Sequence, residues 1–442
     1  MSNLMSKFNS PLVKNLFANF CSLGIALLSQ IVLVPFYIYY WGNDLYSDWI
    51  VLSALTAFFG MTDVGLNTVI HNRFAIQKAK GEMEECNSLI VNNFVIVGVI
   101  FTICIILSTA YILLFDLNSQ MSIHQLSRSS ANWVFILLMC QVFLRMFGGI
   151  ENSIFRAVHK AHVAIYIDQI ANLAIVVLTF ISVYMGISMP VMCFLLCCPN
   201  IITLLVKHWL SKRIYVYKFS LNYVDLGLVK RLLLPSISFL SIPLSNAIVL
   251  QGFTLVVNKF FGADATVIYN TTRTMCNFIK QVLNQINYSA SPEYSIAYGK
   301  SDFRRMLSLY KKAFIMSMTA MSSIIVLLLA FGPLIFDVWT HNQIVFDYPL
   351  MISFLIVTLI ETIWMPSREV VISTNNHMRM CYVFLGTSVV SIALATILSL
   401  LDFSLPSITY TQIFIHLITG LVTIKISNSI INKKVQVKSW NI

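Results

Sequence analysis

The feature that most constrains this chain is a series of apolar segments, each about 18 residues or longer, along nearly its whole length. A helix of about 20 apolar residues crosses the ~30 Å hydrocarbon core of a bilayer. Scanning for such runs predicts an all-α polytopic membrane protein. Its twelve spans are expected near residues 16–40, 48–70, 88–115, 131–155, 164–187, 190–206, 232–259, 265–291, 313–338, 348–369, 381–401 and 406–427.

The composition supports this prediction. Hydrophobic residues make up 58% of the 442 residues and charged residues only 11%, which lies outside the range of soluble globular domains. The first apolar segment is too long for a signal peptide, so it is expected to remain as a transmembrane helix. The nine cysteines lie mostly in or beside apolar segments and form no CxxC pair. Neither a disulfide framework, a metal site nor a cofactor is predicted.

Lys and Arg are distributed unevenly among the predicted loops. If the N-terminus is cytoplasmic, nearly all of the 29 Lys and Arg residues lie on the cytoplasmic side, and only Arg128 and Lys259 lie outside. Because cytoplasmic loops are enriched in Lys and Arg, both termini are expected in the cytoplasm. Topology thus explains the net charge of +11, and nucleic acid is not an expected partner.

The longest predicted cytoplasmic loop lies in the middle of the chain. Residues 211–231 are a basic linker between an N-terminal six-helix lobe, residues 1–210, and a C-terminal six-helix lobe, residues 232–442. The loops on the opposite side are too short to hold an independently folded domain. The chain is therefore not expected to be an enzyme.

The two halves are predicted to be copies of one unit. A shift of 220 residues places residues 41–44 (WGND) over residues 261–264 (FGAD), and it places Gln141 over Glu361. Chance similarity between apolar sequences is the alternative explanation. Duplication of six plus six helices is the architecture of many secondary transporters.

The span at residues 265–291 is unusual because one of its faces is polar. An unpaired charge at the centre of a bilayer costs at least ~2.5 kcal/mol. This face is therefore expected to line a water-filled cavity or to contact an anionic ligand, and a polar seam between helices is the alternative. Its members recur every three or four residues, and they are Asn270, Arg273, Asn277, Lys280, Asn284 and Asn287.

Other charged residues are predicted at membrane depth. Arg145 lies in a second polar stripe, beside Gly148 and Gly149, where another helix could approach closely. A buried carboxylate can exchange protons as access alternates, so the candidates for ion coupling are Asp63, Glu361 and Asp168. Each of these charges could instead belong to a structural ion pair, and Asp168 could simply be interfacial.

Motifs for other chemistry are weak or missing in the sequence. His159 and His162 are spaced i, i+3, but they lie with Lys160 in a basic loop, which we interpret as topogenic rather than as a metal site. The glycines form no phosphate-binding loop, so ATP hydrolysis by this chain is not expected.

Several stretches carry a resemblance to a known family. Residues 39–74 (YYWGNDLYSDWIVLSALTAFFGMTDVGLNTVIHNRF), residues 260–302 and the segment FGPLIFDVWT at 331–340 resemble Wzx-type O-antigen and polysaccharide flippases. These belong to the multidrug/oligosaccharidyl-lipid/polysaccharide (MOP) exporter superfamily. In span number and loop lengths the resemblance covers essentially the whole chain.

The resemblance implies two six-helix lobes around a central cavity that alternates between inward-facing and outward-facing states. The implied substrate is an undecaprenyl-pyrophosphate-linked oligosaccharide, such as an O-antigen or capsule repeat unit. The implied movement is from the cytoplasmic to the periplasmic leaflet of the bacterial inner membrane, coupled in some members to H⁺ or Na⁺. A polysaccharide polymerase and a chain-length regulator of lipopolysaccharide biosynthesis are possible partners.

The family pattern also suggests functional residues. Arg273 and Lys280 match its cationic eighth span, Asp63 matches its acidic second span, and Arg145 fits the same pattern less closely. Arg and Lys would hold the pyrophosphate, and the amides of the eighth span, Asn270, Asn277 and Asn284, would bind sugars. The lipid tail would stay among the membrane lipids.

Two other functions remain open. The same architecture could export drugs or other small molecules, although a cationic cavity disfavours cationic drugs. A membrane polysaccharide polymerase or glycosyltransferase is an alternative from a different class, which the short loops disfavour.

Overall fold

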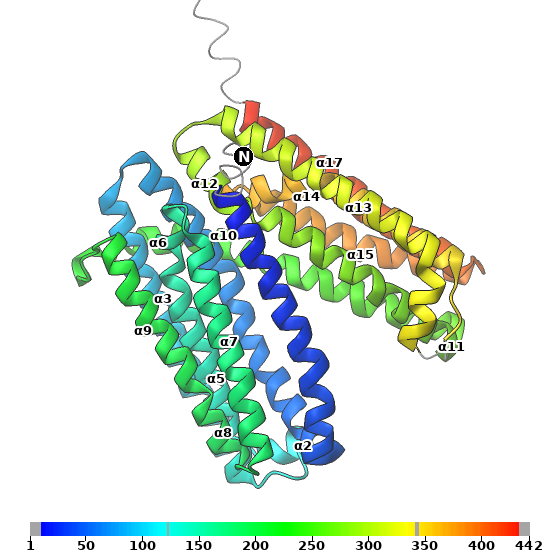
Figure 1. Cartoon of the computed structure of the whole chain (residues 1–442), viewed down its shortest axis with the longest axis horizontal. Helices are drawn as coiled ribbons and strands as arrows, with labels where there is room; N and C mark the ends of the chain where they lie inside the picture. The colour runs from blue at the N-terminus through cyan, green and yellow to red at the C-terminus, as the bar shows by residue number, and fades with distance from the viewer. Residues whose placement is uncertain (1–9, 122, 341–343, 433–442) are drawn as a thin grey trace, which may run out of the picture. The chain divides into compact units, whose positions relative to one another are not determined.

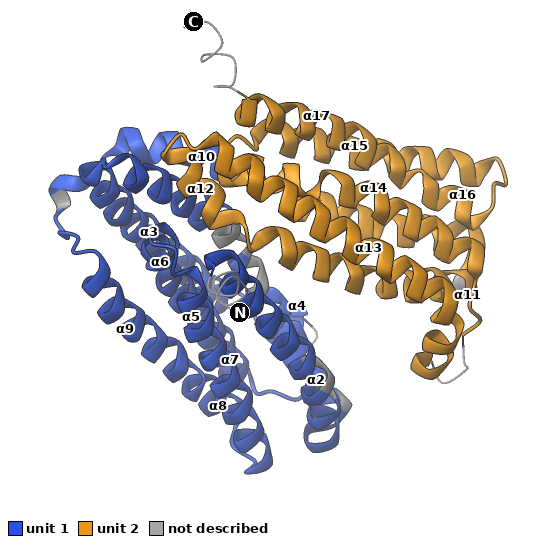
Figure 2. Cartoon of the chain, turned by 45° about the horizontal axis from the view of Figure 1, so that its top comes forward, with its two compact units in different colours: residues 1–236 blue, residues 237–442 orange. Residues whose placement is uncertain are grey.

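The computed structural model describes residues 10–121, 123–340 and 344–432 (Figure 1). Within these ranges every regular element is a helix. The chain divides into two compact units, residues 1–236 and 237–442 (Figure 2).

Unit 1 begins with a long helix, α2, against which α5, α6 and α7 pack. Its core is apolar and contains clusters formed by α2, α3 and α5 and by α2, α5 and α8. The helices of unit 1 are α2 (Pro11–Lys80), α3 (Met83–Leu114), α4 (Leu117–Met121), α5 (Arg128–Ile150), α6 (Asn152–Ala157), α7 (Ala161–Tyr184), α8 (Met189–Leu195), α9 (Cys197–Ile214), the 3₁₀ turn η1 (Leu221–Tyr223) and most of α10 (Leu226–Phe239).

Unit 2 is built around α14. In its most apolar stretch 72% of the residues are buried, a larger share than in any other span found among the described residues. It packs against α11, α13 and α17. The helices of unit 2 are α11 (Ser241–Tyr288), α12 (Ser291–Gly299), α13 (Phe303–Thr340), α14 (Tyr348–Ser373), α15 (Met378–Leu400), α16 (Leu405–Tyr410) and α17 (Gln412–Asn432).

Short-range signals in the sequence fix several helix starts. The Asp347 carboxylate accepts a hydrogen bond from the backbone N–H of Leu350 at 3.0 Å and so caps α14. Proline occupies the first turn of α2, α8, α14 and α16, where its missing N–H costs nothing. The buried Asp48 carboxylate accepts three backbone N–H bonds, at 2.8–3.1 Å, from the residues just before α5. This carboxylate ties α2 to the loop that leads into α5.

Each unit has one long helix with a sharp kink at a glycine. A straight helix of 70 residues, the length of α2, would be about 105 Å long and far exceed the bilayer. Gly42 breaks α2 with φ 71° and ψ 175°, and Gly262 breaks α11 with φ 84° and ψ −178°. Where the sequence predicted short loops between spans, the structure therefore has single-residue kinks.

Ten helical segments among the described residues are long and apolar enough to cross a membrane. The two predicted spans that are not among them are residues 48–70 and 265–291. Both follow a kinked glycine, and the second carries the polar face described above. These two predicted spans occupy equivalent places in the two units.

The backbone geometry repeats along the chain. Eight described residues have a positive φ, and they form four pairs with matching places in the two units. The first two pairs are separated by 220 residues and the last two by 216. They are Gly42 and Gly262, Gly81 and Ser301, His159 and Asn375, and Gly186 and Asp402.

This repeat corrects part of the alignment proposed from the sequence. The shift of 220 still relates the first residues of α5 and α14, Arg128 and Tyr348, but it is 216 at the ends of α6 and α14, Ala157 and Ser373, because α5 and α6 together are four residues longer than α14. Counted back from these matching ends, Glu361 matches Arg145, whereas the sequence alignment placed it over Gln141. By the same shift, Asn200 on α9 matches His416 on α17.

Replacing Gly42 or Gly262 with alanine tests the kinks. A Cβ at either position meets no atom within 4 Å, so the cost is backbone strain alone, about 1–3 kcal/mol. We expect both variants to lower the melting temperature of the purified protein. Gly24→Ala and Gly386→Ala are matched controls, because these glycines are helical and equally open. Equal melting temperatures for all four variants would contradict the role of the kinks.

Candidate functional site

The part of α11 after Gly262 has three faces. An apolar face packs inside unit 2, and its members Met275, Ile279 and Ile286 are buried. The predicted polar face is mostly half-buried, and Asn287 at its end is fully buried and donates to Ser317 Oγ at 2.9 Å. A third face is exposed and carries Thr274, Phe278, Gln281 and Tyr288. The periodicity predicted the apolar and polar faces, and it missed the contribution of Gln281.

Arg273 is held in place by uncharged groups. Its guanidinium donates to the carbonyl oxygen of Leu250 at 2.7 Å, to Thr254 Oγ1 at 3.0 Å and to Asn270 Oδ1 at 2.5 Å. It also lies 5.4 Å from the centroid of the Tyr269 ring. In the described part of the chain no carboxylate pairs with it. The orientation of Arg273 is therefore fixed, while its charge is left uncompensated.

Lys280 has a carboxylate partner. Its Nζ lies 2.8 Å from Glu361 Oε2 on α14, and only 12% of the Glu361 side chain is exposed. His416 Nε2 on α17 lies 3.7 Å from the same oxygen. Oε2 has no well-directed hydrogen bond, so the contact with Lys280 is mainly electrostatic. This pair joins the predicted polar face to the predicted coupling residue.

A further cation, Arg368, lies on α14 and contacts α11 beyond the pair of Lys280 and Glu361. Arg368 on α14 donates through Nη2 to Asn284 Oδ1 at 2.5 Å, and its guanidinium lies 5.8 Å from the centroid of the Trp364 ring. Arg368 follows Glu361 by seven residues, which places both on one face of a helix. Sequence reasoning did not select Arg368 or His416, although this spacing could have indicated Arg368. The polar centre of unit 2 therefore holds more positive than negative charge.

Unit 1 carries the opposite charge at the matching position. Arg145 on α5 is exposed, and its Nε donates to Asn200 Oδ1 on α9 at 3.1 Å. Under the shift of 216 this contact matches that of Glu361 with His416. Gln141, one turn away, donates to the Cys193 carbonyl oxygen at 2.9 Å and serves packing.

Asp168 compensates a buried lysine. Its Oδ1 lies 2.6 Å from Lys207 Nζ, and 1% of the Lys207 side chain is exposed. The predicted sixth span ended at residue 206, which left Lys207 outside it, whereas Lys207 lies within α9. Because a buried charge without its partner is strongly destabilising, this pair has a clear structural role. That role makes Asp168 a weaker candidate for coupling than Glu361.

Glu151 is also fully buried in unit 1. It accepts hydrogen bonds from the Tyr217 hydroxyl at 2.9 Å and lies 2.9 Å from His208 Nδ1. Burial raises the pKa of Tyr217 well above its usual value, so the hydroxyl stays protonated and keeps donating. Glu151 thus binds the segment after α9 to the end of α5, and its recorded partners are Tyr217 and His208 rather than Arg145.

The predicted close approach at Gly149 is present. A Cβ on Gly149 would lie 2.9 Å from Asn67 Nδ2, which itself donates to the Met146 carbonyl oxygen at 3.2 Å. His71 Nε2 contacts the Gly149 carbonyl oxygen at 2.8 Å. This part of the α2–α5 contact is a polar helix seam rather than an exposed site.

The side chain of Asp63 lies outside the described residues, so its predicted role stays a prediction. Among the residues that the structure describes, no group of three or more His, Cys, Asp or Glu is placed to hold a metal ion.

Comparison with known proteins gives one family and one fold. A family model described as "Polysaccharide biosynthesis protein" matches residues 12–293. The structure resembles a MATE transporter crystallised with MaL6, with 13% identity, a TM-score of 0.77 and 96% of both chains covered. It also resembles a MOP superfamily transporter from Pyrococcus furiosus described as having a binding pocket of reverse polarity, with 13% identity, a TM-score of 0.73 and 96% and 95% covered.

A third similar structure is an outward-facing multidrug resistance MATE transporter, with 12% identity, a TM-score of 0.76 and 96% and 97% covered. At these identities the similarity concerns the fold alone, and it confirms the predicted class, an all-α polytopic membrane protein of two lobes. No curated protein sequence matches significantly.

A double-mutant cycle tests the pair of Lys280 and Glu361. Lys280→Met leaves a buried carboxylate without its cation, which we expect to cost about 3–5 kcal/mol in stability. Adding Glu361→Gln removes that carboxylate and should recover part of the loss. The measurement is thermal or denaturant unfolding of the three variants in one detergent. A double variant as unstable as the sum of the single variants would show that the two residues are not coupled.

Proposed function

Because this chain belongs to the polysaccharide biosynthesis protein family and has the fold of MOP superfamily transporters, we propose that it is a flippase for a lipid-linked oligosaccharide. The proposed substrate is an undecaprenyl-pyrophosphate-linked O-antigen or capsule repeat unit. It would move from the cytoplasmic to the periplasmic leaflet of a bacterial inner membrane, where a polymerase and a chain-length regulator would receive it.

The observation that carries this proposal is the uncompensated positive charge on α11. Arg273 is oriented by neutral partners, so its charge is available to an anion. Arg offers a planar pair of donors that suits phosphate oxygens. The pyrophosphate of the substrate is the proposed ligand, and Arg145 of unit 1 is a second candidate contact.

The amides beside Arg273 and Lys280 suit the sugar part of the substrate. Asn270, Asn277 and Asn284 are half-exposed, and the neighbouring Gln281 is exposed. Each amide provides both donors and acceptors, which match sugar hydroxyl groups. The lipid tail needs no polar contact and would remain in the bilayer.

The pair of Lys280 and Glu361 suggests how ion movement is coupled to transport. An anionic headgroup that draws Lys280 away leaves Glu361 buried without a cation. A proton stabilises such a carboxylate, because burial disfavours its charged form. Release of the headgroup would let Lys280 return and expel the proton. Asp63 and Asp168 remain further candidates, and Na⁺ could replace the proton.

Export of small molecules is the second candidate function, since MATE transporters share the fold. Such an exporter of cationic drugs would need acidic residues in its cavity. The excess of positive charge around α11 favours an anionic substrate instead.

Arg273→Ala should reduce translocation of the lipid-linked oligosaccharide about 10- to 100-fold, because a charged hydrogen bond contributes about 1.5–3 kcal/mol. The measurement is the appearance of substrate in the outer leaflet of proteoliposomes, at equal protein content. Lys259→Ala is the control, because Lys259 is an exposed cation on α11 just before the kink at Gly262. Undiminished translocation by Arg273→Ala would refute the phosphate contact.

Glu361→Gln should make the rate of translocation independent of the ion gradient. We expect the variant to translocate substrate slowly and at the same rate with or without a pH or Na⁺ gradient. Glu84→Gln, at an exposed carboxylate on α3, should keep the dependence on the gradient. A Glu361→Gln protein that still responds fully to the gradient would rule out this carboxylate as the coupling group.

A further inference from the structure

Two cavities of unit 1 lie along the same faces of α7 and α9, and we call this shared face the furrow. The residues of α7 and α9 that line one or the other cavity recur every three or four positions on each helix, which places them on one face. On α7 this face runs through Val163, Ile167, Ala171, Ala174 and Leu178. On α9 it runs through Pro199, Ile202, Val206, Leu210 and Arg213.

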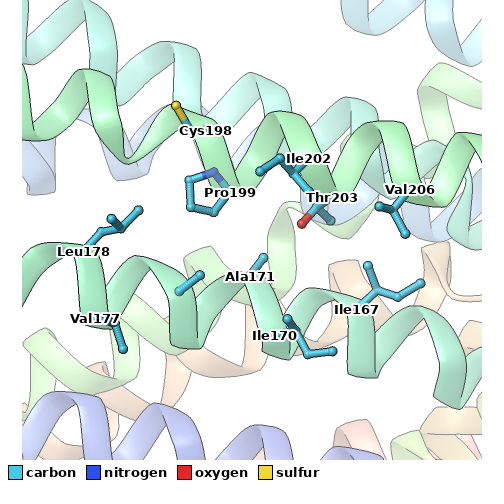
Figure 3. A pocket seen from close by; sticks show the side chains of 11 residues that line it. Ile167, Ile170, Ala171, Val177, Leu178, Cys198, Pro199, Ile202, Thr203 and Val206 are labelled. Atoms are coloured by element: carbon cyan, nitrogen blue, oxygen red, sulfur yellow. The ribbon is translucent and has the colours of Figure 1, made fainter.

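The middle of the furrow is an apolar groove with a volume of about 480 Å³ (Figure 3). Ile170, Val177 and Ile202 line it with exposed apolar side chains, and Thr203 supplies the one hydroxyl group in its wall. From Val163 to Leu178 the furrow extends about 22 Å along α7. That length exceeds half of the ~30 Å hydrocarbon core, so the furrow can hold a lipid chain of one leaflet along its course.

The end of the furrow near the start of α7 is a basic pocket of about 550 Å³. Lys14, Lys160 and Arg213 line it together with His159 and His162. In the described part of the chain none of the three cations pairs with a carboxylate. Its remaining walls are apolar, and no acidic, amide or hydroxyl side chain lines it.

The shape of this pocket is fixed by its surroundings. The Asn15 carboxamide oxygen accepts a hydrogen bond from the His162 backbone N–H at 3.0 Å, which joins α2 to the first turn of α7. The Arg213 guanidinium lies 3.7 Å from the centroid of the Trp209 ring. Three parts of unit 1 therefore meet at the pocket: the start of α2, the turn before α7 and the end of α9.

We propose that this furrow binds an anionic phospholipid. Its phosphate groups would pair with Lys14, Lys160 and Arg213, and one of its acyl chains would fill the groove between α7 and α9. Basic pockets between membrane helices at the cytoplasmic surface suit such headgroups. A lipid-linked oligosaccharide fits less well, because the pocket offers no amide or hydroxyl side chains for sugars. The sequence His159–His162, interpreted above as topogenic, is part of this site.

The bound lipid would link the start of α2, the turn before α7 and the end of α9. Binding to the folded protein alone stabilises it, so an anionic lipid should raise the melting temperature. Phosphatidylcholine, which has no net charge, should raise it less. This inference does not depend on the transported substrate.

The test measures binding of phosphatidylglycerol and cardiolipin to the full-length protein by native mass spectrometry and by thermal shift. Lys160→Ala/Arg213→Ala should bind about 25-fold more weakly, since each positive charge near an anionic lipid contributes about fivefold. Lys300→Ala/Arg304→Ala removes the same two charges from an exposed segment of unit 2, and this control should bind as the unmodified protein does. Equal binding by the two double variants would overturn the proposal.

A second variant tests the groove without changing any charge. Ala174→Trp fills the space between α7 and α9. We expect it to weaken binding of long-chain phosphatidylglycerol while short-chain dihexanoyl phosphatidylglycerol binds as before. Phosphatidylcholine that binds as tightly as phosphatidylglycerol would overturn the proposal. The proposal would also be overturned if geranylgeranyl pyrophosphate bound the protein saturably while neither anionic phospholipid bound. The occupant of the furrow would then be an isoprenoid.

Discussion

The ion pair between Lys280 and Glu361 is the interaction on which the polar centre of unit 2 depends. Hydrocarbon cannot solvate either charge, so each is tolerable only beside the other or beside water. The pair fixes α11 against α14 and brings His416 of α17 to the same oxygen. It leaves the positive charges of Arg273 and Arg368 as an excess. A site with this balance is suited to an anion, and the anion would compete with Glu361 for Lys280.

The kinked glycines explain how such a polar segment is accommodated. Gly42 and Gly262 each divide a long helix, so the polar segment after the kink is a span of its own. The repeated backbone geometry shows that both units use this device. Their chemistry nevertheless differs, because Arg145 of unit 1 matches Glu361 of unit 2. The same backbone framework thus carries opposite charges at equivalent positions, which makes the two units chemically unequal.

The sequence predicted what depends on local periodicity and on hydropathy. The all-α membrane class follows from run length, and the polar face of α11 follows from spacing. The partner of Lys280 could not be predicted, because Glu361 lies on another helix and only packing brings the two together. Lys207 was placed in a loop because it is charged, although Asp168 makes its burial in α9 possible. The change of the repeat from 220 to 216 could not be predicted, because it arises within apolar helices, where a difference of four residues, about one turn, leaves the helical period intact.

The proposed function requires that the polar face of α11 is open to water and to substrate. Single cysteines placed from 270 to 287, in a protein whose nine native cysteines are replaced, measure this directly. We expect a water-soluble thiol reagent to modify cysteines at positions 270, 273, 277 and 284, while those at 275, 279 and 286 stay unmodified. Lipid-linked oligosaccharide should protect the modified positions. Modification without this helical period, or without protection by the substrate, would contradict the proposed function.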